Sequence, residues 1–351
     1  MELVFGPPAP FYVLYFIFSL PCAGGPEYTP RETGGTVPQT PADLLVPFAC
    51  LLGAFVGSFL NVCIYRLPRE NLHIFRPAWS RCTFCLTTIR WYDNIPILSW
   101  LLLGRKCRDC RSPIAVLYPL IEALTAALFA LVAWLVIHRH AELSLPWQQG
   151  VLFAVQAYLI GCLIVSTFID LELRIIPDEL TFIGMILAPI AGCAFPFLYP
   201  GRLPDHTSAS VAGMLFSYCP SLYTFLSTHP HVQGLSEALL GMAVGGFSVW
   251  GVGFLGRIAF RKEAMGLGDV KYMAFLGGFL GWKGILVTFV LAAILGAVCG
   301  ILAYLATRDR TMAFGPYLSI GALVMTLVPE DTVSLYLALM NGLVYWLTRP
   351  K

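Results

Sequence analysis

Long apolar runs divided by short polar segments are the dominant pattern of this chain. A helix that crosses a membrane needs about 20 predominantly apolar residues. A run at about 333–347 is shorter and is typical of an interfacial segment or a last, tilted span. The pattern predicts an all-α polytopic membrane protein with about eight transmembrane helices, at about 43–65, 114–137, 149–170, 175–199, 235–256, 268–282, 284–306 and 313–328.

Composition narrows the class of protein further. Hydrophobic residues make up 58% of the chain and charged residues only 12%, against about 25% charged residues in typical soluble domains. A soluble globular enzyme, a disordered chain and a small disulfide scaffold are therefore excluded. Lys and Arg number 22 and Asp and Glu 20, for a formal net charge of +2, so we expect no nucleic-acid partner. The expected surroundings are a lipid bilayer.

Basic residues are distributed unevenly between the polar segments. The segment 66–112 is rich in Lys and Arg, and if each apolar run crosses once, most of the 22 basic residues lie on that same face. Loops rich in Lys and Arg face the cytoplasm. The stretch Phe11–Leu20 has no Lys or Arg before it, which argues against a cleaved signal peptide. We treat the N-terminal residues as an extension with an interfacial or membrane segment.

Four of the eleven cysteines form two pairs in the basic loop, Cys82-x-x-Cys85 and Cys107-x-x-Cys110. Two such pairs supply four thiolates for a tetrahedral metal, and zinc fits this ligand set best. A disulfide would not persist in a reducing cytoplasm, and free thiols are the competing interpretation. Four cysteines leave no open coordination position, so we expect a structural zinc site rather than a catalytic one.

Acidic side chains inside or beside the apolar runs are the candidates for chemistry. Burying an acid at the bilayer centre costs at least ~2.5 to 3.5 kcal/mol, and four stand out: Glu122, Asp170, Asp178 and Asp269. Two carboxylates at one membrane depth could share a proton and activate a water, as in aspartic proteases. Helix capping or pairing with Lys or Arg is the competing interpretation, favoured for Asp178. Physical reasoning alone does not choose between Asp170 and Asp178.

The motifs in sequence order resemble those of the type IV prepilin peptidases, which are membrane aspartic proteases of the GxGD kind. The resemblance spans about 50–330. It rests on six stretches: 57–68 (GSFLNVCIYRLP), 92–100 between the cysteine pairs, 118–122, 169–178 with Ile169-Asp170 and Ile176-Pro177-Asp178, 266–271 (GLGDVK) and 314–317 (FGPY).

This resemblance implies an enzyme that removes the leader of type IV prepilins or pseudopilins at the cytoplasmic face of the bacterial inner membrane. It implies that Asp170 and Asp269 are catalytic. It also implies N-methylation of the new N-terminal residue with S-adenosylmethionine as donor, a function associated with the cysteine loop. Asn61, Arg66 and Glu122 are candidate cofactor-binding residues, with helix packing or snorkelling to the interface as the competing interpretations.

The resemblance also suggests a domain organisation. We expect an N-terminal extension at 1–42, a first family helix at 43–65, a cytoplasmic zinc-binding, methyltransferase-associated loop at 66–113, a transmembrane aspartic peptidase bundle at 114–330, and a C-terminal interfacial or transmembrane segment at 331–351. Two alternative functions stay open: a GxGD intramembrane protease without methyltransferase activity, and a transporter that couples transport to protons through membrane carboxylates.

Overall fold

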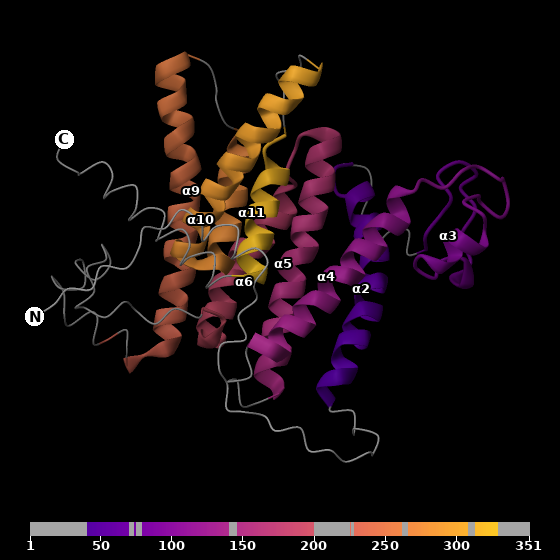
Figure 1. The fold of residues 1–351 in the computed structure, drawn as a ribbon, viewed down its shortest axis with the longest axis horizontal. Coiled ribbons are helices and arrows are strands. Elements are labelled where there is room, and N and C mark those ends of the chain that lie inside the picture. Colours follow the sequence, from indigo (N-terminus) through magenta and orange to yellow (C-terminus); the bar gives the residue numbers. More distant parts are fainter. Residues whose placement is uncertain are drawn as a thin grey trace, which may run out of the picture. The chain divides into compact units, whose positions relative to one another are not determined.

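The described part of the protein is helical. The computed structural model describes residues 41–69, 74, 79–139, 146–199, 225, 228–261, 266–307 and 313–328. Within these ranges β-structure is limited to two isolated bridges, so the prediction of an all-α membrane protein is confirmed there. Residues 1–40 of the predicted extension and the predicted segment 331–351 lie outside the described residues. The helices, shown in Figure 1, are α2 (Pro41–Arg66), η1 (Trp91–Asp93), α3 (Leu98–Leu102), α4 (Leu117–Arg139), α5 (Pro146–Leu173), α6 (Asp178–Ala194), η2 (Pro196–Leu198), α9 (Pro230–Phe260), α10 (Leu267–Thr307) and α11 (Gly315–Leu327).

Five of these helices are long and apolar enough to cross a membrane. The candidate spans are Leu44–Arg66, Leu117–Arg139, Trp147–Leu173, Pro230–Ala259 and Leu267–Leu305. The predicted count of about eight spans is not confirmed among the described residues. Helices α6 and α11 form where spans were expected but have only 17 and 13 residues, and the runs predicted at 268–282 and 284–306 join in α10.

Helix α10 is broken at Gly281, where the two predicted runs meet. Gly281 has φ 69° and ψ 171°, a conformation that glycine adopts readily and other residues avoid. A Cβ placed on Gly245 of α9 would touch both Met273 and Ile285, which lie on opposite sides of the break. The two parts of α10, which we call its first leg (267–280) and second leg (282–307), therefore double back and lie side by side near Gly281.

Helices α2 and α4 pack closely through small residues. A Cβ on Gly57 would lie 2.7 Å from the Cα of Glu122, and one on Gly53 would lie 2.8 Å from the Cα of Ala126. The residue numbers rise along one helix as they fall along the other, so the two helices are antiparallel. This is the close helix approach that small residues permit in membranes.

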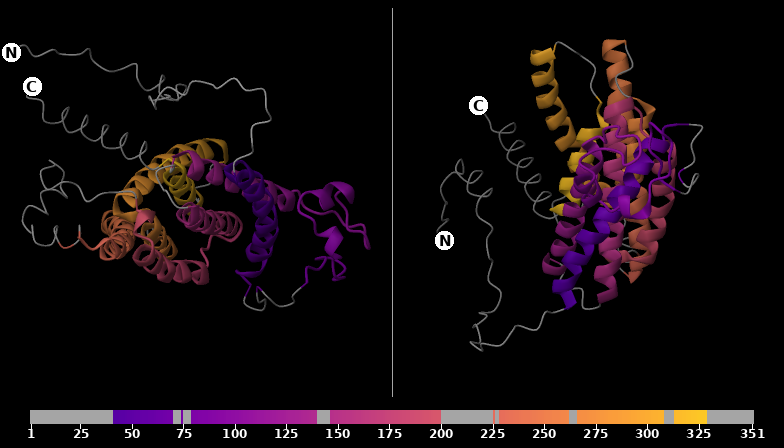
Figure 2. Two further views of the ribbon diagram at one scale, coloured as in Figure 1. Left: turned by 90° about the horizontal axis from the view of Figure 1, so that it is seen from below. Right: turned by 90° about the vertical axis from the view of Figure 1, so that its right-hand side faces the viewer.

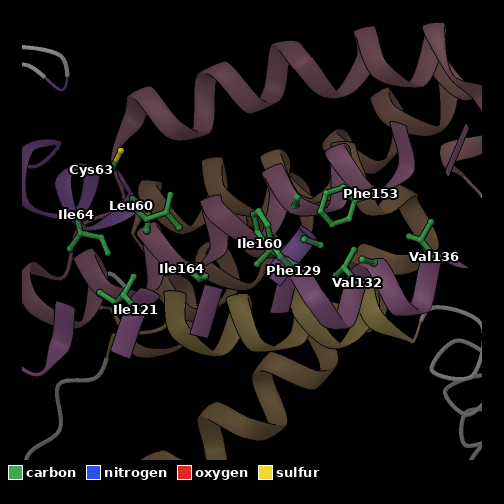
Figure 3. Close-up of a cluster of buried hydrophobic side chains, with 14 of the residues drawn as sticks. Leu60, Cys63, Ile64, Ile121, Phe129, Val132, Val136, Phe153, Ile160 and Ile164 are labelled. Carbon is green, nitrogen blue, oxygen red and sulfur yellow. The ribbon is translucent and has the colours of Figure 1, made fainter. Parts of the chain in front are cut away.

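Apolar side chains from α2, α4 and α5 form one of two buried clusters. Figure 3 shows side chains of this cluster, among them Leu60 of α2, Ile121 and Phe129 of α4, and Phe153 and Ile160 of α5. Phe129 and Phe153 meet edge to face with ring centroids 5.9 Å apart. The second cluster joins α5, α9, α10 and α11. Helix α5 contributes to both clusters and so connects the two halves of the bundle, which the left view of Figure 2 shows from below.

The antiparallel packing brings several helix termini to one end of the bundle. Near the end of α2, the Asn61 side chain donates to the carbonyl of Tyr118 at the start of α4. The start of α11 contacts the last turn of α5 through Gly315 and Asp170. The cysteine loop between α2 and α4 and the acids of α5 and α10 therefore belong to this same end.

Candidate active site

Asp170 and Asp269 come together from helices that are remote in sequence. Asp170 lies in the last turn of α5 and is only 6% exposed. Asp269 lies in the first turn of α10 and is half-buried. The two carboxylates are close enough to interact electrostatically. Two acids at one end of the bundle and within Coulombic range of each other form an arrangement that can hold a water and share a proton.

A glycine N–H fixes each of the two carboxylates. The Gly315 N–H at the start of α11 donates to Asp170 Oδ2 over 3.0 Å, where the helix dipole also favours negative charge. The Gly266 N–H donates to the Asp269 carboxylate. A Cβ on Gly315 would lie 2.6 Å from Asp170 Oδ2, so a larger residue at this position would displace the acid.

The third acid of this region, Asp178, has a different environment. It is the first residue of α6, and both of its carboxylate oxygens accept hydrogen bonds from Lys271 Nζ of α10, at 2.9 and 2.8 Å. The pair is solvent-accessible, with side-chain exposures of 36% for Lys271 and 55% for Asp178. Asp178 thus has the lysine partner that the competing interpretation assigned to it.

A cluster of three buried hydroxyl groups, which sequence reasoning missed, lies beside the acids. Tyr272 of α10 is fully buried, and its hydroxyl oxygen lies 2.5 Å from Ser166 Oγ of α5 and 2.7 Å from Ser319 Oγ of α11. Each residue is three or four positions from Asp170, Asp269 or Gly315 along its helix. The signal in the sequence was a tyrosine in an apolar run, since a buried tyrosine hydroxyl needs a partner, but the partner could not be named.

The four cysteines of the loop gather into one cluster that could hold a metal ion. Their sulfur atoms all lie within 4.8 Å of one another, and Cys82 Sγ lies 3.8 Å from Cys110 Sγ. A tetrahedron with Zn–S bonds of about 2.3 Å has sulfur atoms about 3.8 Å apart. The donor set and its spacing therefore fit a tetrahedral zinc ion held by Cys82, Cys85, Cys107 and Cys110.

The two cysteine pairs have the same backbone geometry, repeated along the loop. In the first, the Leu86 N–H donates to the Cys82 carbonyl and Leu86 has φ 59°; in the second, the Arg111 N–H donates to the Cys107 carbonyl and Arg111 has φ 60°. Each is closed by an isolated bridge, Arg81 to Thr88 and Lys106 to Pro113. Each pair thus lies in a compact turn, and the two turns together bring the four sulfur atoms within 4.8 Å of one another.

The thiols of the cluster differ in how readily they ionise. Burial opposes ionisation of Cys82, but hydrogen bonds from the Cys85 and Phe84 N–H groups and from Ser112 lower the pKa of its thiol to about 6. A hydrogen bond from Ser112 also lowers the pKa of the Cys110 thiol. Backbone N–H groups of Cys110 and Asp109 donate to the Cys107 sulfur and favour its ionisation, but burial and hydrogen bonds with the Cys110 and Cys82 thiols raise its pKa to about 11. Four adjacent thiols can all lose their protons only when a bound cation balances the negative charge of the thiolates.

The three candidate cofactor-binding residues connect the loop to the helices. Glu122 Oε2 of α4 accepts a hydrogen bond from the Ile97 N–H at 2.7 Å, and the Ser58 hydroxyl also contacts this carboxylate. Asn61 donates to the Tyr118 carbonyl, and Arg66 Nη1 donates to the Ile74 carbonyl at 2.7 Å. Glu122 and Arg66 thus contact loop residues, whereas Asn61 joins α2 to α4. A role toward a methyl donor stays a prediction.

Comparison with known proteins identifies relatives over both halves of the chain. The family model "Bacterial Peptidase A24 N-terminal domain" matches residues 51–136 and the model "Type IV leader peptidase family" matches residues 157–301. No solved structure matches significantly.

Several curated relatives carry the name prepilin leader peptidase/N-methyltransferase. One from Myxococcus xanthus is 37% identical over 275 residues, covering 78% of this chain and 68% of that protein. One from Stutzerimonas stutzeri is 31% identical over 82% of this chain and 92% of its own length. One from Neisseria gonorrhoeae is 30% identical over 87% of this chain and 96% of its own length. The chain therefore belongs to the type IV leader peptidase family.

Proposed function

We propose that this protein is a membrane aspartic endopeptidase that removes the leader peptide of type IV prepilins or pseudopilins and then N-methylates the new N-terminal residue. The names of the relatives support both activities. A transporter that couples transport to protons is not favoured, because both family models and all the named relatives point to a peptidase. The double cysteine pair, together with the relatives' names, argues against a protease that lacks methyl transfer.

In the proposed cleavage step, Asp170 and Asp269 hold one water and one proton between them. The ionised carboxylate takes a proton from the water, and the water oxygen attacks the scissile carbonyl carbon. At the same time the protonated carboxyl group donates its proton to the carbonyl oxygen. Proton transfer to the leaving nitrogen then breaks the C–N bond. Gly315 and Gly266 hold the two carboxylates in place through their N–H groups, so each acid keeps one orientation.

The observation that carries this proposal is the meeting of the two acids at the end of the bundle. Asp170 is buried beside Gly315 and interacts electrostatically with Asp269, whereas Asp178 is exposed and paired with Lys271. The proposal therefore assigns cleavage to Asp170 and Asp269 and leaves Asp178 outside the chemistry.

The test is cleavage of a purified prepilin by the purified full-length protein in bilayer nanodiscs, measured by intact mass. We expect the wild type to release the leader, and Asp170→Asn to lower kcat by roughly a thousandfold, within the range for loss of a general acid or base. Asp178→Asn is the matched control and should retain cleavage within a few-fold. Full cleavage by Asp170→Asn would refute the assignment.

The cysteine loop is the proposed location of methyl transfer. Zinc held by the four cysteines would act as a structural centre that stabilises a loop with little core of its own. S-adenosylmethionine would supply the methyl group. Adding it to the same assay should increase the mass of the cleaved pilin by one methyl group, and an unmethylated product would refute this activity.

The proposed setting is the bacterial inner membrane, with the acids and the loop on the cytoplasmic side. The loop described between Arg81 and Arg111 carries most of its charge as Arg and Lys, which favours a cytoplasmic location. The division into a loop at 66–113 and a peptidase bundle at 114–330 is part of the same proposal.

A further inference from the structure

The hydroxyl cluster of Ser166, Tyr272 and Ser319 joins the three helices that bring the candidate acids together. Ser166 belongs to α5, one turn before Asp170, and Tyr272 to α10, three residues after Asp269. Ser319 belongs to α11, one turn after Gly315. The cluster thus repeats, one turn deeper in the bundle, the same three-helix junction that holds the acids.

Because the three hydroxyl groups are buried, their contacts fix the relative positions of α5, α10 and α11. Tyr272 is fully buried, and Ser166 and Ser319 are only 1% and 4% exposed. In a dry, apolar interior, a tyrosine hydroxyl loses free energy unless it finds a partner at a defined position. Sliding or rotating any one of the three helices would break at least one of the two contacts of the Tyr272 hydroxyl. The Tyr272 hydroxyl also lies within electrostatic range of Asp170.

We propose that Tyr272 is a positioning residue, whose hydroxyl bridges Ser166 and Ser319 and so sets the register at which Asp170, Asp269 and the Gly315 N–H meet. The inference rests on the proposed peptidase function. Tyr272 does not touch the reacting atoms in this account. Its hydroxyl fixes the positions of α5, α10 and α11, and a displacement of about 1 Å at the acids is enough to slow catalysis strongly.

Removal of this hydroxyl is a clean experiment because it leaves no serine without a partner. Ser166 Oγ lies 2.8 Å from the Cys162 carbonyl oxygen and Ser319 Oγ lies 3.0 Å from the Gly315 carbonyl oxygen, so each serine can donate to its own helix once the tyrosine hydroxyl is gone. Phenylalanine in place of Tyr272 keeps the ring against Phe275, with which Tyr272 stacks at 5.9 Å between centroids. Tyr272→Phe therefore deletes the bridge while sparing the apolar packing.

The matched control is Tyr199→Phe. The Tyr199 hydroxyl donates to the Gly278 carbonyl, so it also connects α10 to a neighbouring segment, but near the break at Gly281 and away from Asp269. Each variant removes one tyrosine hydroxyl that makes a hydrogen bond at α10, a fully buried one at Tyr272 and a half-buried one at Tyr199. A general loss of stability would affect both, whereas a loss of positioning would affect only Tyr272→Phe.

The test measures kcat and KM for prepilin cleavage in nanodiscs. Methylation of pre-cleaved pilin is measured in parallel, because this reaction does not need the cleavage step. We expect Tyr272→Phe to lower kcat by roughly ten- to a hundredfold, with KM within about twofold and methylation unchanged. Tyr199→Phe should keep wild-type kcat. An unchanged kcat in Tyr272→Phe, or an equal loss of cleavage and methylation, would overturn the inference.

A second variant guards against failure of the first to fold. Ser319→Ala removes one contact of the bridge and leaves the Tyr272 hydroxyl its contact with Ser166, so kcat should fall less than in Tyr272→Phe but still by several-fold. Wild-type kcat in Ser319→Ala would overturn the inference by itself. No cleavage by the wild type would instead overturn the proposed function, which separates the two failures.

Discussion

In the cysteine loop most hydrogen bonds join residues a few positions apart, whereas at the acid site they join different helices. The Leu86 N–H reaches only back to the Cys82 carbonyl. Gly315 and Asp170, by contrast, are 145 positions apart, and Ser166 and Tyr272 are 106 apart. Local turns with a metal-ligand pattern can form wherever the loop lies. The acid site exists only when the whole bundle is assembled.

This difference predicts that the cysteine loop and the acid site can be disrupted separately. The largest expected effect is the loss of methylation when the metal ligands are removed. Cys85→Ser with Cys110→Ser removes half of the sulfur ligands, so we expect loss of bound zinc and at least about a hundredfold loss of methylation, because the ligands and the fold of such a loop depend on each other. Metal content is measured by elemental analysis and methylation by mass spectrometry.

Cleavage should survive the same substitutions within a few-fold, because no described contact of Asp170 or Asp269 involves the loop. The matched control is Cys63→Ser with Cys162→Ser, which changes two cysteines outside the cluster. Loss of cleavage in step with zinc would show that the loop and the acid site depend on each other, and would contradict the comparison.

Replacing the glycine beside Asp170 with alanine should have an intermediate effect on the rate of cleavage. Gly315→Ala would place a Cβ 2.6 Å from Asp170 Oδ2, so the acid or the start of α11 must move. We expect kcat for cleavage to fall roughly ten- to a hundredfold with methylation retained.

Gly296→Ala is a suitable control, because a Cβ there would lie 3.4 Å from Phe314, a nearly ordinary contact. Equal kcat values for the two alanine variants would contradict the steric argument. The assay is the nanodisc cleavage reaction already described.

The smallest expected effect concerns an ion pair inside the loop. Arg108 makes two hydrogen bonds to Asp93, at 2.8 and 2.5 Å, and the guanidinium holds the pKa of the Asp93 carboxyl below its usual value. A depressed pKa stabilises the fold above the unfolded-state value of about 3.9, and this contribution is lost as pH falls through the folded-state pKa.

Asp93→Asn should therefore speed hydrogen exchange of the loop amides at neutral pH, by less than about fivefold because the pair is partly exposed. The difference from the wild type should disappear in acid, below the pKa of the Asp93 carboxyl. A difference that persists there would mean that Asp93 acts through its shape or packing rather than its charge.

The sequence was most informative where the determining pattern is local. The spacing of Cys82, Cys85, Cys107 and Cys110 indicated one four-sulfur cluster, and the structure has it. The apolar runs located α2, α4 and α5 to within a few residues. They did not reveal that α6 and α11 are short, because the length of an apolar run does not determine where its helix ends.

The acid site was predictable only in part. A carboxylate in an apolar run marked Asp170 and Asp269, but electrostatic reasoning gave no choice between Asp170 and Asp178 until Lys271 was found beside Asp178. Tyr272 and Ser319 could not be paired from the sequence, because no periodicity relates residues of α10 and α11 that meet across an interface. Contacts of this kind require the three-dimensional arrangement of the helices.

The break at Gly281 has a consequence for the membrane around the first leg of α10. At 1.5 Å per residue this leg of 14 residues is about 21 Å long, shorter than a hydrocarbon core of about 30 Å. A leg of this length that starts at one membrane surface ends inside the bilayer, where unbonded carbonyls are costly. Tyr199 meets this need at Gly278. Asp269 is thus carried by a helix about two thirds as long as the hydrocarbon core is thick, and the far end of this helix is bonded to the hydroxyl of Tyr199 instead of to lipid headgroups.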